Sequence, residues 1–131
     1  MRPYRVLVVD DEPDFLETLV RRLERREIPA RGAASGKEAL AVLETEPCDV
    51  MILDVKMPGM DGLEVLRVVK TRWPAVEVIL LTGHASVESG IQGMELGAFD
   101  YVMKPCKLAD LIPKVEQAYE RKLLRERAGP P

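Results

Sequence analysis

Five short apolar runs alternate along this chain with segments whose apolar residues recur at helical spacing. The runs are predicted to be strands, at Tyr4–Val9, Pro29–Ala34, Val50–Leu53, Val76–Leu81 and Tyr101–Met103. A strand followed by a helix, repeated five times, is typical of a parallel sheet with helices on both faces. The alternation therefore predicts an α/β fold with a doubly wound five-stranded sheet.

The segments between the runs carry helix signals. In the first segment an apolar stripe lies opposite a basic one, formed by Arg21, Arg22, Arg25 and Arg26. Ser35 with Glu38, and Asp61 with Glu64, have the spacing of capping boxes, which mark helix starts. The first predicted helix follows Pro13. The others cover Lys37–Glu46, Leu63–Arg72, a segment from a cap at Ser86 to about Gly97, and Leu108–Arg127.

The composition fits a small single domain. The 131 residues suit one core, and a net charge of −3 gives no reason to expect direct nucleic-acid binding. Two cysteines outside any paired motif fit a reducing compartment. The first apolar run is too short to span a membrane, and a single histidine excludes histidine-cluster metal sites. We therefore expect a cytoplasmic domain over residues 1–127, followed by a flexible tail or linker start at 128–131.

Reactive polar residues follow four of the five predicted strands. Asp10 and Asp11 follow the first strand, Asp54 the third, Thr82 the fourth and Lys104 the fifth. In open α/β sheets, ligands bind beyond the carboxyl ends of the strands. These side chains are therefore expected to converge at one edge of the sheet.

Three converging carboxylates need a cation or a proton. Two unit charges about 4 Å apart repel by about 4 kcal/mol at an effective dielectric near 20. A set of oxygen ligands without histidine or cysteine suits a hard ion, Mg²⁺ or Mn²⁺, and Mg²⁺ is the usual partner of phosphate chemistry. The ammonium of Lys104 can stabilise phosphoryl oxygens. The pattern predicts a phosphoryl-transfer site in which Asp54 is the nucleophile.

Four sequence stretches carry a family resemblance: VVDDEP, ILDVKMPGMDGLEVL, LLTGHAS and YVMKP. In this order and spacing they resemble the receiver domain of bacterial two-component response regulators, of the chemotaxis-regulator type. The resemblance covers nearly the whole chain. It implies a flavodoxin-like fold with strand order 2-1-3-4-5.

The resemblance also implies roles for the site residues. Asp54 is expected to accept a phosphoryl group from a histidine kinase or a histidine phosphotransfer protein. Asp10, Asp11, Asp54 and the backbone carbonyl of Lys56 are expected to bind the metal ion, and Lys104 to contact the phosphoryl group. The domain would then be a regulator rather than an enzyme of metabolism. Its own phosphorylation is the reaction that it would catalyse, and its dephosphorylation is a second activity that the resemblance allows.

The same resemblance implies a conformational switch. Thr82 is expected to move toward the phosphoryl group while the ring of Tyr101 turns inward. This would change the face formed by the fourth helix, the fifth strand and the fifth helix, which would bind a downstream effector or a second copy of the chain. The Lys104–Pro105 peptide is expected to be cis, and Lys56 and His84 are expected to influence the lifetime of the phosphorylated state.

Other interpretations of these residues exist. Taken singly, Asp11 could cap the first helix, Asp54 and Lys104 could be loop charges, and Thr82 and Tyr101 could be ordinary strand residues. A docking receiver that never takes phosphate is a further possibility, although the complete set of reactive residues argues against it.

Two enzyme classes are disfavoured. An aspartate-nucleophile phosphatase of the haloacid dehalogenase type needs an acid two residues after the nucleophile, where this chain has Lys56. A nucleotide-binding loop is also disfavoured, because Gly36-Lys37 lacks the earlier glycine and the following hydroxyl residue of such a loop.

Two helices have unusual compositions. Gly90 and Gly93 lie in the fourth helix, and each costs up to about 1 kcal/mol relative to alanine, which predicts a weakly formed helix before phosphorylation. Pro113 lies in the fifth helix, which should either kink there or become regular only near Ile112, and Lys107 is a poor cap for its start.

Overall fold

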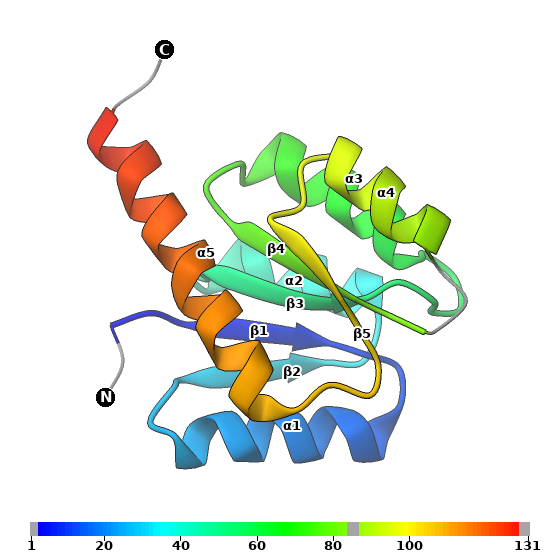
Figure 1. Ribbon diagram of the computed structural model, residues 1–131. Helices are drawn as coiled ribbons and strands as arrows, with labels where there is room; N and C mark the ends of the chain where they lie inside the picture. Colours follow the sequence, from blue (N-terminus) through cyan, green and yellow to red (C-terminus); the bar gives the residue numbers. More distant parts are fainter. Residues whose placement is uncertain (1–2, 84–86, 129–131) are drawn as a thin grey trace.

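A single parallel sheet forms the centre of the computed structural model, which describes residues 3–83 and 87–128. Within these residues the sheet has five strands in the order β2-β1-β3-β4-β5, as the family resemblance implies (Figure 1). All neighbouring strands are parallel. The strands are β1 (Val6–Val9), β2 (Ala30–Ala33), β3 (Val50–Asp54), β4 (Glu77–Thr82) and β5 (Asp100–Met103).

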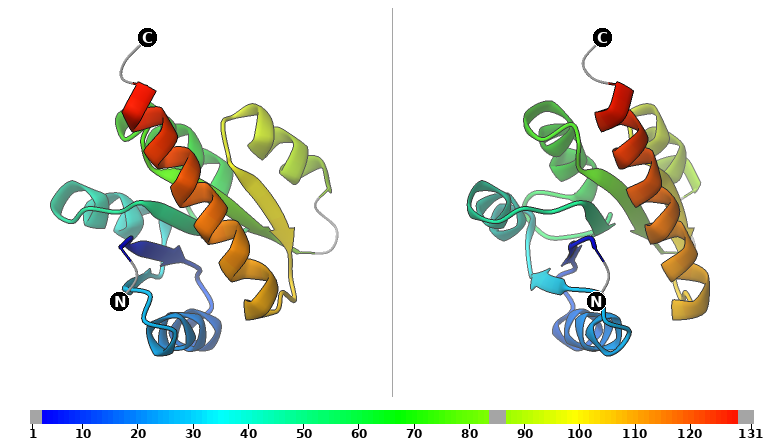
Figure 2. Two further views of the ribbon diagram at one scale, coloured as in Figure 1. Left: turned by 60° about the vertical axis from the view of Figure 1, so that its left-hand side comes forward. Right: turned by 90° about the vertical axis from the view of Figure 1, so that its left-hand side faces the viewer.

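The helices form a layer on each side of the sheet (Figure 2). Side chains alternate between the two faces of a strand, so each central strand contributes apolar residues to both layers. On one face the core includes residues of α1 and α5, and on the other residues of α2 and α3. The helices are α1 (Pro13–Arg25), α2 (Gly36–Thr45), α3 (Gly62–Arg72), α4 (Val87–Glu95) and α5 (Leu108–Ala128).

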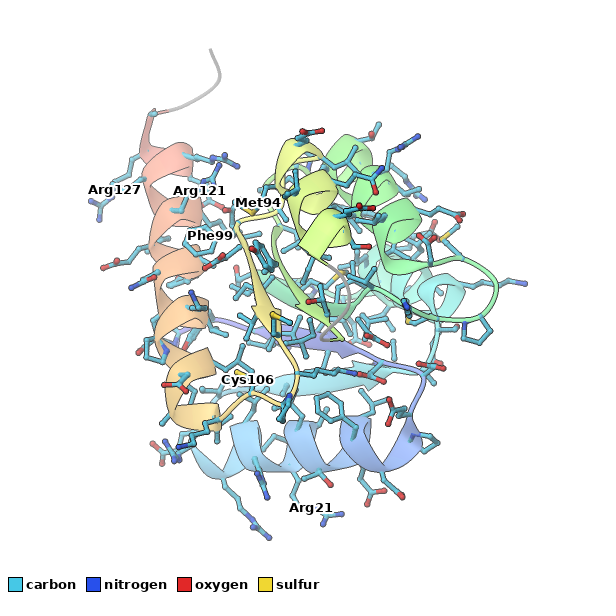
Figure 3. All side chains as sticks on the ribbon, turned by 45° about the vertical axis from the view of Figure 1, so that its right-hand side comes forward. Arg21, Met94, Phe99, Cys106, Arg121 and Arg127 are labelled. Atoms are coloured by element: carbon cyan, nitrogen blue, oxygen red, sulfur yellow. The ribbon has the colours of Figure 1, made fainter. Side chains whose placement is uncertain are left out.

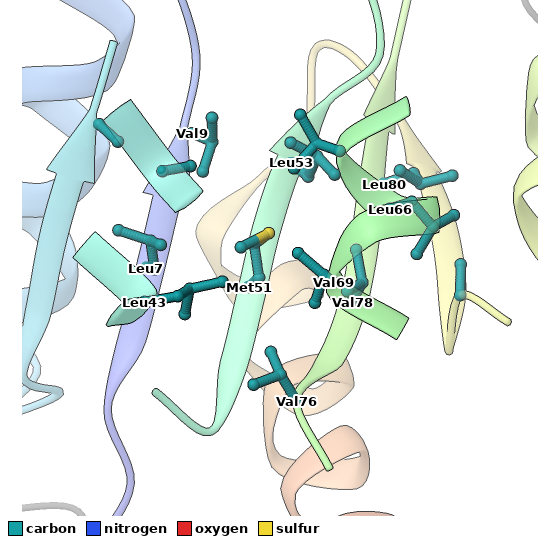
Figure 4. Packing of buried hydrophobic residues seen from close by; sticks show 14 of the residues in the cluster. Leu7, Val9, Leu43, Met51, Leu53, Leu66, Val69, Val76, Val78 and Leu80 are labelled. Atoms are coloured by element: carbon teal, nitrogen blue, oxygen red, sulfur yellow. The ribbon is translucent and has the colours of Figure 1, made fainter. Parts of the chain in front are cut away.

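The amphipathic pattern of α1 matches its position. Leu19 and Leu23 are buried against the sheet, whereas the four arginines of the helix and its end are exposed. Arg21 points away from the protein in Figure 3. On the opposite face, Leu7 of β1 and Met51 of β3 belong to the core that α2 and α3 cover, as Figure 4 shows.

The predicted capping residues can be compared with the hydrogen bonds at the helix starts. Both capping residues are confirmed, because the amide of Glu38 donates to Ser35 Oγ and the amide of Glu64 donates to Asp61 Oδ1. The alternative that Asp11 caps the first helix is wrong. The N-cap of α1 is Glu12, which makes no side-chain capping bond, and Pro13 supplies the first helical φ without needing a hydrogen-bond acceptor. The predicted cap at Ser86 lies outside the described residues.

Pro113 lies inside a helix that is already regular at Leu108. The amides of Asp110 and Leu111 donate to the carbonyl of Lys107, which closes the first turn. The alternative start near Ile112 is therefore wrong. Pro113 and Ala109 are exposed, so water can hydrogen-bond to the carbonyl that proline leaves without a donor.

The two glycines of α4 lie where other groups approach the helix backbone. A Cβ atom at Gly93 would lie 2.1 Å from Leu80 Cδ1, and one at Gly90 would lie 2.9 Å from the ring of Tyr101. Real Cβ contacts are longer than this. A larger residue at either position would therefore require Leu80 or the ring of Tyr101 to shift, so the present packing of α4 on β4 and β5 depends on the glycines, whatever they cost in helix propensity.

Candidate functional site

The predicted site residues lie at the carboxyl edge of the sheet, toward which the strand arrows of Figure 1 point. Asp10 directly follows β1, Asp54 and Thr82 are the last residues of β3 and β4, and Lys104 directly follows β5. β3 lies between β1 and β4, so Asp54 is at the centre of this edge. The parallel register brings together residues that are up to 94 positions apart in the chain.

Three carboxylates form a compact cluster. Asp10, Asp11 and Asp54 each offer one oxygen atom, and these atoms lie within 4.8 Å of one another. Asp10 is fully buried, the Asp54 side chain is 8% exposed and Asp11 is half-buried. Buried oxygen ligands at this spacing fit a hard divalent cation, which would neutralise charge that the protein alone leaves in excess.

The carboxyl of Asp54 shows the consequence of this crowding. Its pKa is raised to about 6, first because burial removes water from the charged form and then because Asp10 repels it. Lys104 lowers the pKa and offsets part of this effect. In the folded protein the ionised form of Asp54 is therefore disfavoured, and a bound cation would stabilise it.

Lys104 supplies the positive charge at the site. Its Nζ atom donates to Asp10 Oδ2 at 2.7 Å and lies 3.5 Å from Asp54 Oδ1 and 4.0 Å from Glu12 Oε1. Burial alone would lower the pKa of Lys104, but the hydrogen bond to Asp10 and the nearby carboxylates raise it above its ordinary value. The lysine therefore stays charged, and its nearest partner is Asp10 rather than Asp54.

Thr82 and Tyr101 lie on adjacent strands beside this cluster. Among the described residues, Thr82 Oγ1 is buried and has no hydrogen-bond partner. A buried hydroxyl without a partner is destabilising by about 1–3 kcal/mol, so this group gains by moving to a new acceptor. The ring of Tyr101 is half-buried and packs against α4 at Gly90.

The loop after β3 passes close to the site. Gly62, at the start of α3, lies so near β3 that a Cβ atom there would be 2.2 Å from the carbonyl oxygen of Asp54. The amide of Gly62 donates to the carbonyl of Val55 at 2.8 Å. The side chain of Lys56 is exposed in this loop, and the metal contact of its carbonyl stays a prediction. The Lys104–Pro105 peptide is cis, as expected, whereas His84 lies outside the described residues.

Phe15 is a neighbour of the site that the sequence did not predict. The centroid of the Phe15 ring lies 4.4 Å from Lys104 Nζ. Phe15 counts as one of several apolar residues in the stripe of the first helix, and its distance from the lysine in the sequence gives no sign of contact. Its place in the first turn after the two acids is the one signal that could have indicated it.

The chain is similar to known proteins along most of its length. Residues 6–116 match the family model of the response regulator receiver domain. The chain belongs to this family. It is therefore a signalling domain, of a family that typically uses phosphorylation and Mg²⁺.

Similar proteins include regulators of transcription. The receiver is 36% identical over 124 residues to a putative NtrX-like response regulator of Rickettsia bellii, covering 92% of this chain and 26% of that protein. It is 36% identical over 113 residues to the DNA-binding transcriptional regulator NtrC of Salmonella typhimurium, covering 86% of this chain and 24% of that protein. The chain thus spans about a quarter of the length of these curated relatives.

A solved structure agrees with the fold. The response regulator receiver domain protein of Clostridium thermocellum has a TM-score of 0.87 and 36% identity, with 92% of this chain and 98% of that chain covered. Among the helices of the described residues, none combines the length and the apolar character that crossing a membrane requires.

Proposed function

We propose that this receiver accepts a phosphoryl group on Asp54 from a histidine kinase or a histidine phosphotransfer protein. The observation that carries the proposal is the cluster of three acids, with Lys104 Nζ 3.5 Å from Asp54 Oδ1. Asp10, Asp11, Asp54 and the carbonyl of Lys56 are the proposed ligands of Mg²⁺ or Mn²⁺. When bound, the cation would neutralise the carboxylates and the phosphoryl oxygens.

The chemistry follows from the charges at the site. A carboxylate oxygen of Asp54 attacks the phosphorus atom, and the bond from phosphorus to the imidazole nitrogen of the donor histidine breaks. The electron pair of that bond stays on the imidazole. Lys104 donates to a phosphoryl oxygen. Its ammonium has three donors, of which one bonds Asp10 Oδ2 in the unphosphorylated protein, and Nζ already lies 3.5 Å from Asp54 Oδ1.

The switch that we propose starts at Thr82. Its buried hydroxyl would donate to a phosphoryl oxygen, which satisfies a group without a partner among the described residues. The movement would leave space for the ring of Tyr101 to turn inward from α4. We expect α4 to be weakly formed before phosphorylation, and slow amide exchange throughout this helix in the unphosphorylated protein would contradict that expectation.

The face that would change includes exposed apolar side chains. Ile91 and Met94 of α4 and Met103 of β5 are 53%, 43% and 40% exposed, and Met94 is labelled on this side of the molecule in Figure 3. An apolar surface next to the switch supports its use for a downstream effector or for a homodimer. Size-exclusion chromatography before and after phosphorylation distinguishes the dimer from a monomer.

Two residues are proposed to influence how long the signal lasts. Lys56 and His84 follow Asp54 and Thr82 by two positions, where side chains can control the access of water to the phosphoryl group. Replacing either residue is expected to change the rate of dephosphorylation without preventing phosphorylation. Unchanged decay in both variants contradicts this role.

The domain is proposed to act in the cytoplasm, either as a stand-alone receiver or as part of a longer regulator. Residues 1–127 would form the receiver, and 128–131 a flexible tail or the start of a linker, of which 129–131 lie outside the described residues. Its reaction would be its own phosphorylation, with its dephosphorylation as a second proposed activity, in a two-component signalling pathway.

The direct test is incubation with Mg²⁺ and a small phosphodonor, followed by intact mass measurement. The wild type is expected to gain one phosphoryl group, and Asp54→Asn to gain none. Asp14→Asn is a matched control, because Asp14 is an exposed acid of α1 outside the cluster. Absence of phosphate on the wild type, or its presence on Asp54→Asn, contradicts the proposal.

A further inference from the structure

The ammonium of Lys104 has two kinds of neighbour. The first kind is carboxylate oxygens, those of Asp10, Asp54 and Glu12, which lie 2.7, 3.5 and 4.0 Å from Nζ. The second kind is the aromatic ring of Phe15, whose centroid lies 4.4 Å from Nζ. An ammonium within about 6 Å of a ring centroid is attracted by the negative face of the ring.

We propose that Phe15 is a positioning residue for Lys104. The face of its ring attracts the ammonium and, together with Asp10, keeps it next to the acidic cluster. The inference rests on the proposed phosphorylation of Asp54, because that reaction requires the ammonium to remain within reach of Asp54.

An aromatic ring suits this task better than another carboxylate. A carboxylate next to Lys104 neutralises the charge and competes with phosphoryl oxygens for its hydrogen bonds. A ring attracts the cation without accepting its hydrogen bonds in this way, so the three donors of the ammonium stay available. The lysine is thus held in place and keeps the charge that the reaction needs.

The ring is well placed to be rigid. Phe15 is half-buried in the first turns of α1 and packs on the core that includes Leu81 and Leu111. It also lines a groove between α1 and α5 with Leu81, Leu111 and Cys106. Packing against apolar neighbours fixes the ring, so the position of the ring can fix that of the lysine.

The chain itself supplies a matched control. It contains two phenylalanines, Phe15 and Phe99, and the centroid of the Phe99 ring lies 5.7 Å from Arg121 Cζ, on α5. Figure 3 shows Phe99 close to Arg121 at the end of the molecule remote from Cys106. Both rings lie beside a cation, and only Phe15 lies at the acidic cluster.

The experiment replaces each phenylalanine in turn with its mono-, di- and trifluorinated analogues in the full chain. Fluorination weakens the negative ring face and changes the ring volume little. At position 15 we expect the rate of phosphorylation by a small phosphodonor to fall stepwise, by roughly 3- to 10-fold for the trifluorinated ring. At position 99 we expect no change. A rate that does not depend on fluorination at position 15 overturns the proposal.

A second measurement does not depend on phosphorylation. The ring face should displace the NMR signals of the Lys104 side chain through its ring current. We expect the displacement to disappear in Phe15→Leu and to persist in Phe99→Leu. Lys104 signals unaffected by Phe15→Leu overturn the proposal even if the wild type is phosphorylated. If the wild type takes no phosphate, the proposed function fails, and the Lys104 signals still show whether the Phe15 ring holds the ammonium.

Discussion

The two edges of the parallel sheet carry opposite charge balances. At the carboxyl edge, three acids form a cluster, and one lysine, Lys104, lies next to two of them, Asp10 and Asp54. At the amino edge, in the described part of the chain, one buried acid lies among three cations. This acid is Glu77, which is 1% exposed and lies 3.6, 3.4 and 2.9 Å from Lys70, Arg121 and Arg125.

The difference separates a reactive site from a structural one. An excess of buried acid can be relieved by a cation or a proton, so the carboxyl edge is suited to binding and chemistry. Glu77 has its charge already compensated by residues of α3 and α5. Burial lowers the pKa of Lys70, and Glu77 partly restores it. The amino edge therefore fastens the C-terminal half of α5 to the sheet.

The largest effect is expected from Glu77→Gln. It leaves Lys70 and two arginines without their buried anion, and the free energy of unfolding should fall by about 2–4 kcal/mol. Urea denaturation measures this. Glu44→Gln is the control, because Glu44 pairs with Arg72 on the surface and should change stability by less than about 1 kcal/mol. Equal losses of stability in Glu77→Gln and Glu44→Gln would contradict the structural role of the buried Glu77. Phosphorylation of Glu77→Gln should persist under conditions where it is folded.

Removing a buried acid at the carboxyl edge is expected to stabilise the protein, whereas removing Glu77 destabilises it. At pH 7 without Mg²⁺, Asp54→Asn should raise the free energy of unfolding by about 1–3 kcal/mol, because the raised pKa shows that folding disfavours the ionised carboxyl. The loss of the contact with Lys104 reduces this gain. Destabilisation by Asp54→Asn at pH 7 would contradict the charge balance described above.

The pH dependence provides a separate test of that carboxyl. The pKa of Asp54 is about 6 in the folded protein against 3.8 for the unperturbed group. A raised carboxyl pKa means that the folded state binds the proton more tightly, so stability falls as the pH rises from about 4 to about 6. The advantage of Asp54→Asn should be absent below pH 4, grow across this range and stay constant above it. Urea titrations at several pH values measure the difference.

The smallest effect is expected from Arg125→Ala. Arg125 donates to Glu77 at 2.9 Å, but its side chain is 47% exposed, so stability should fall by only about 1 kcal/mol or less. Amide exchange should become faster in the last turns of α5, because this contact fastens them to β4. Arg127→Ala, a change to an exposed residue of the same turns, should leave exchange there unaltered.

Most of the carboxyl edge could be predicted from the sequence. Strands of a parallel sheet end at the same edge, so Asp10, Asp54, Thr82 and Lys104 had to converge once the alternation of strands and helices was recognised. The amino edge could not be predicted in this way. Glu77 stands at the start of an apolar run, and the arginines that compensate it are 44 and 48 residues later in the chain.

The sequence by itself determined the strand order by family resemblance, the residues at the strand ends and the chemistry that their types allow. These depend on local periodicity and on the identity of side chains. Only the tertiary structure decided that Lys104 bonds to Asp10 and lies over Phe15, that Tyr101 packs on Gly90, and that Glu77 is compensated. Such contacts depend on how distant helices and loops pack on the sheet, and the spacing of residues along the chain does not contain that information.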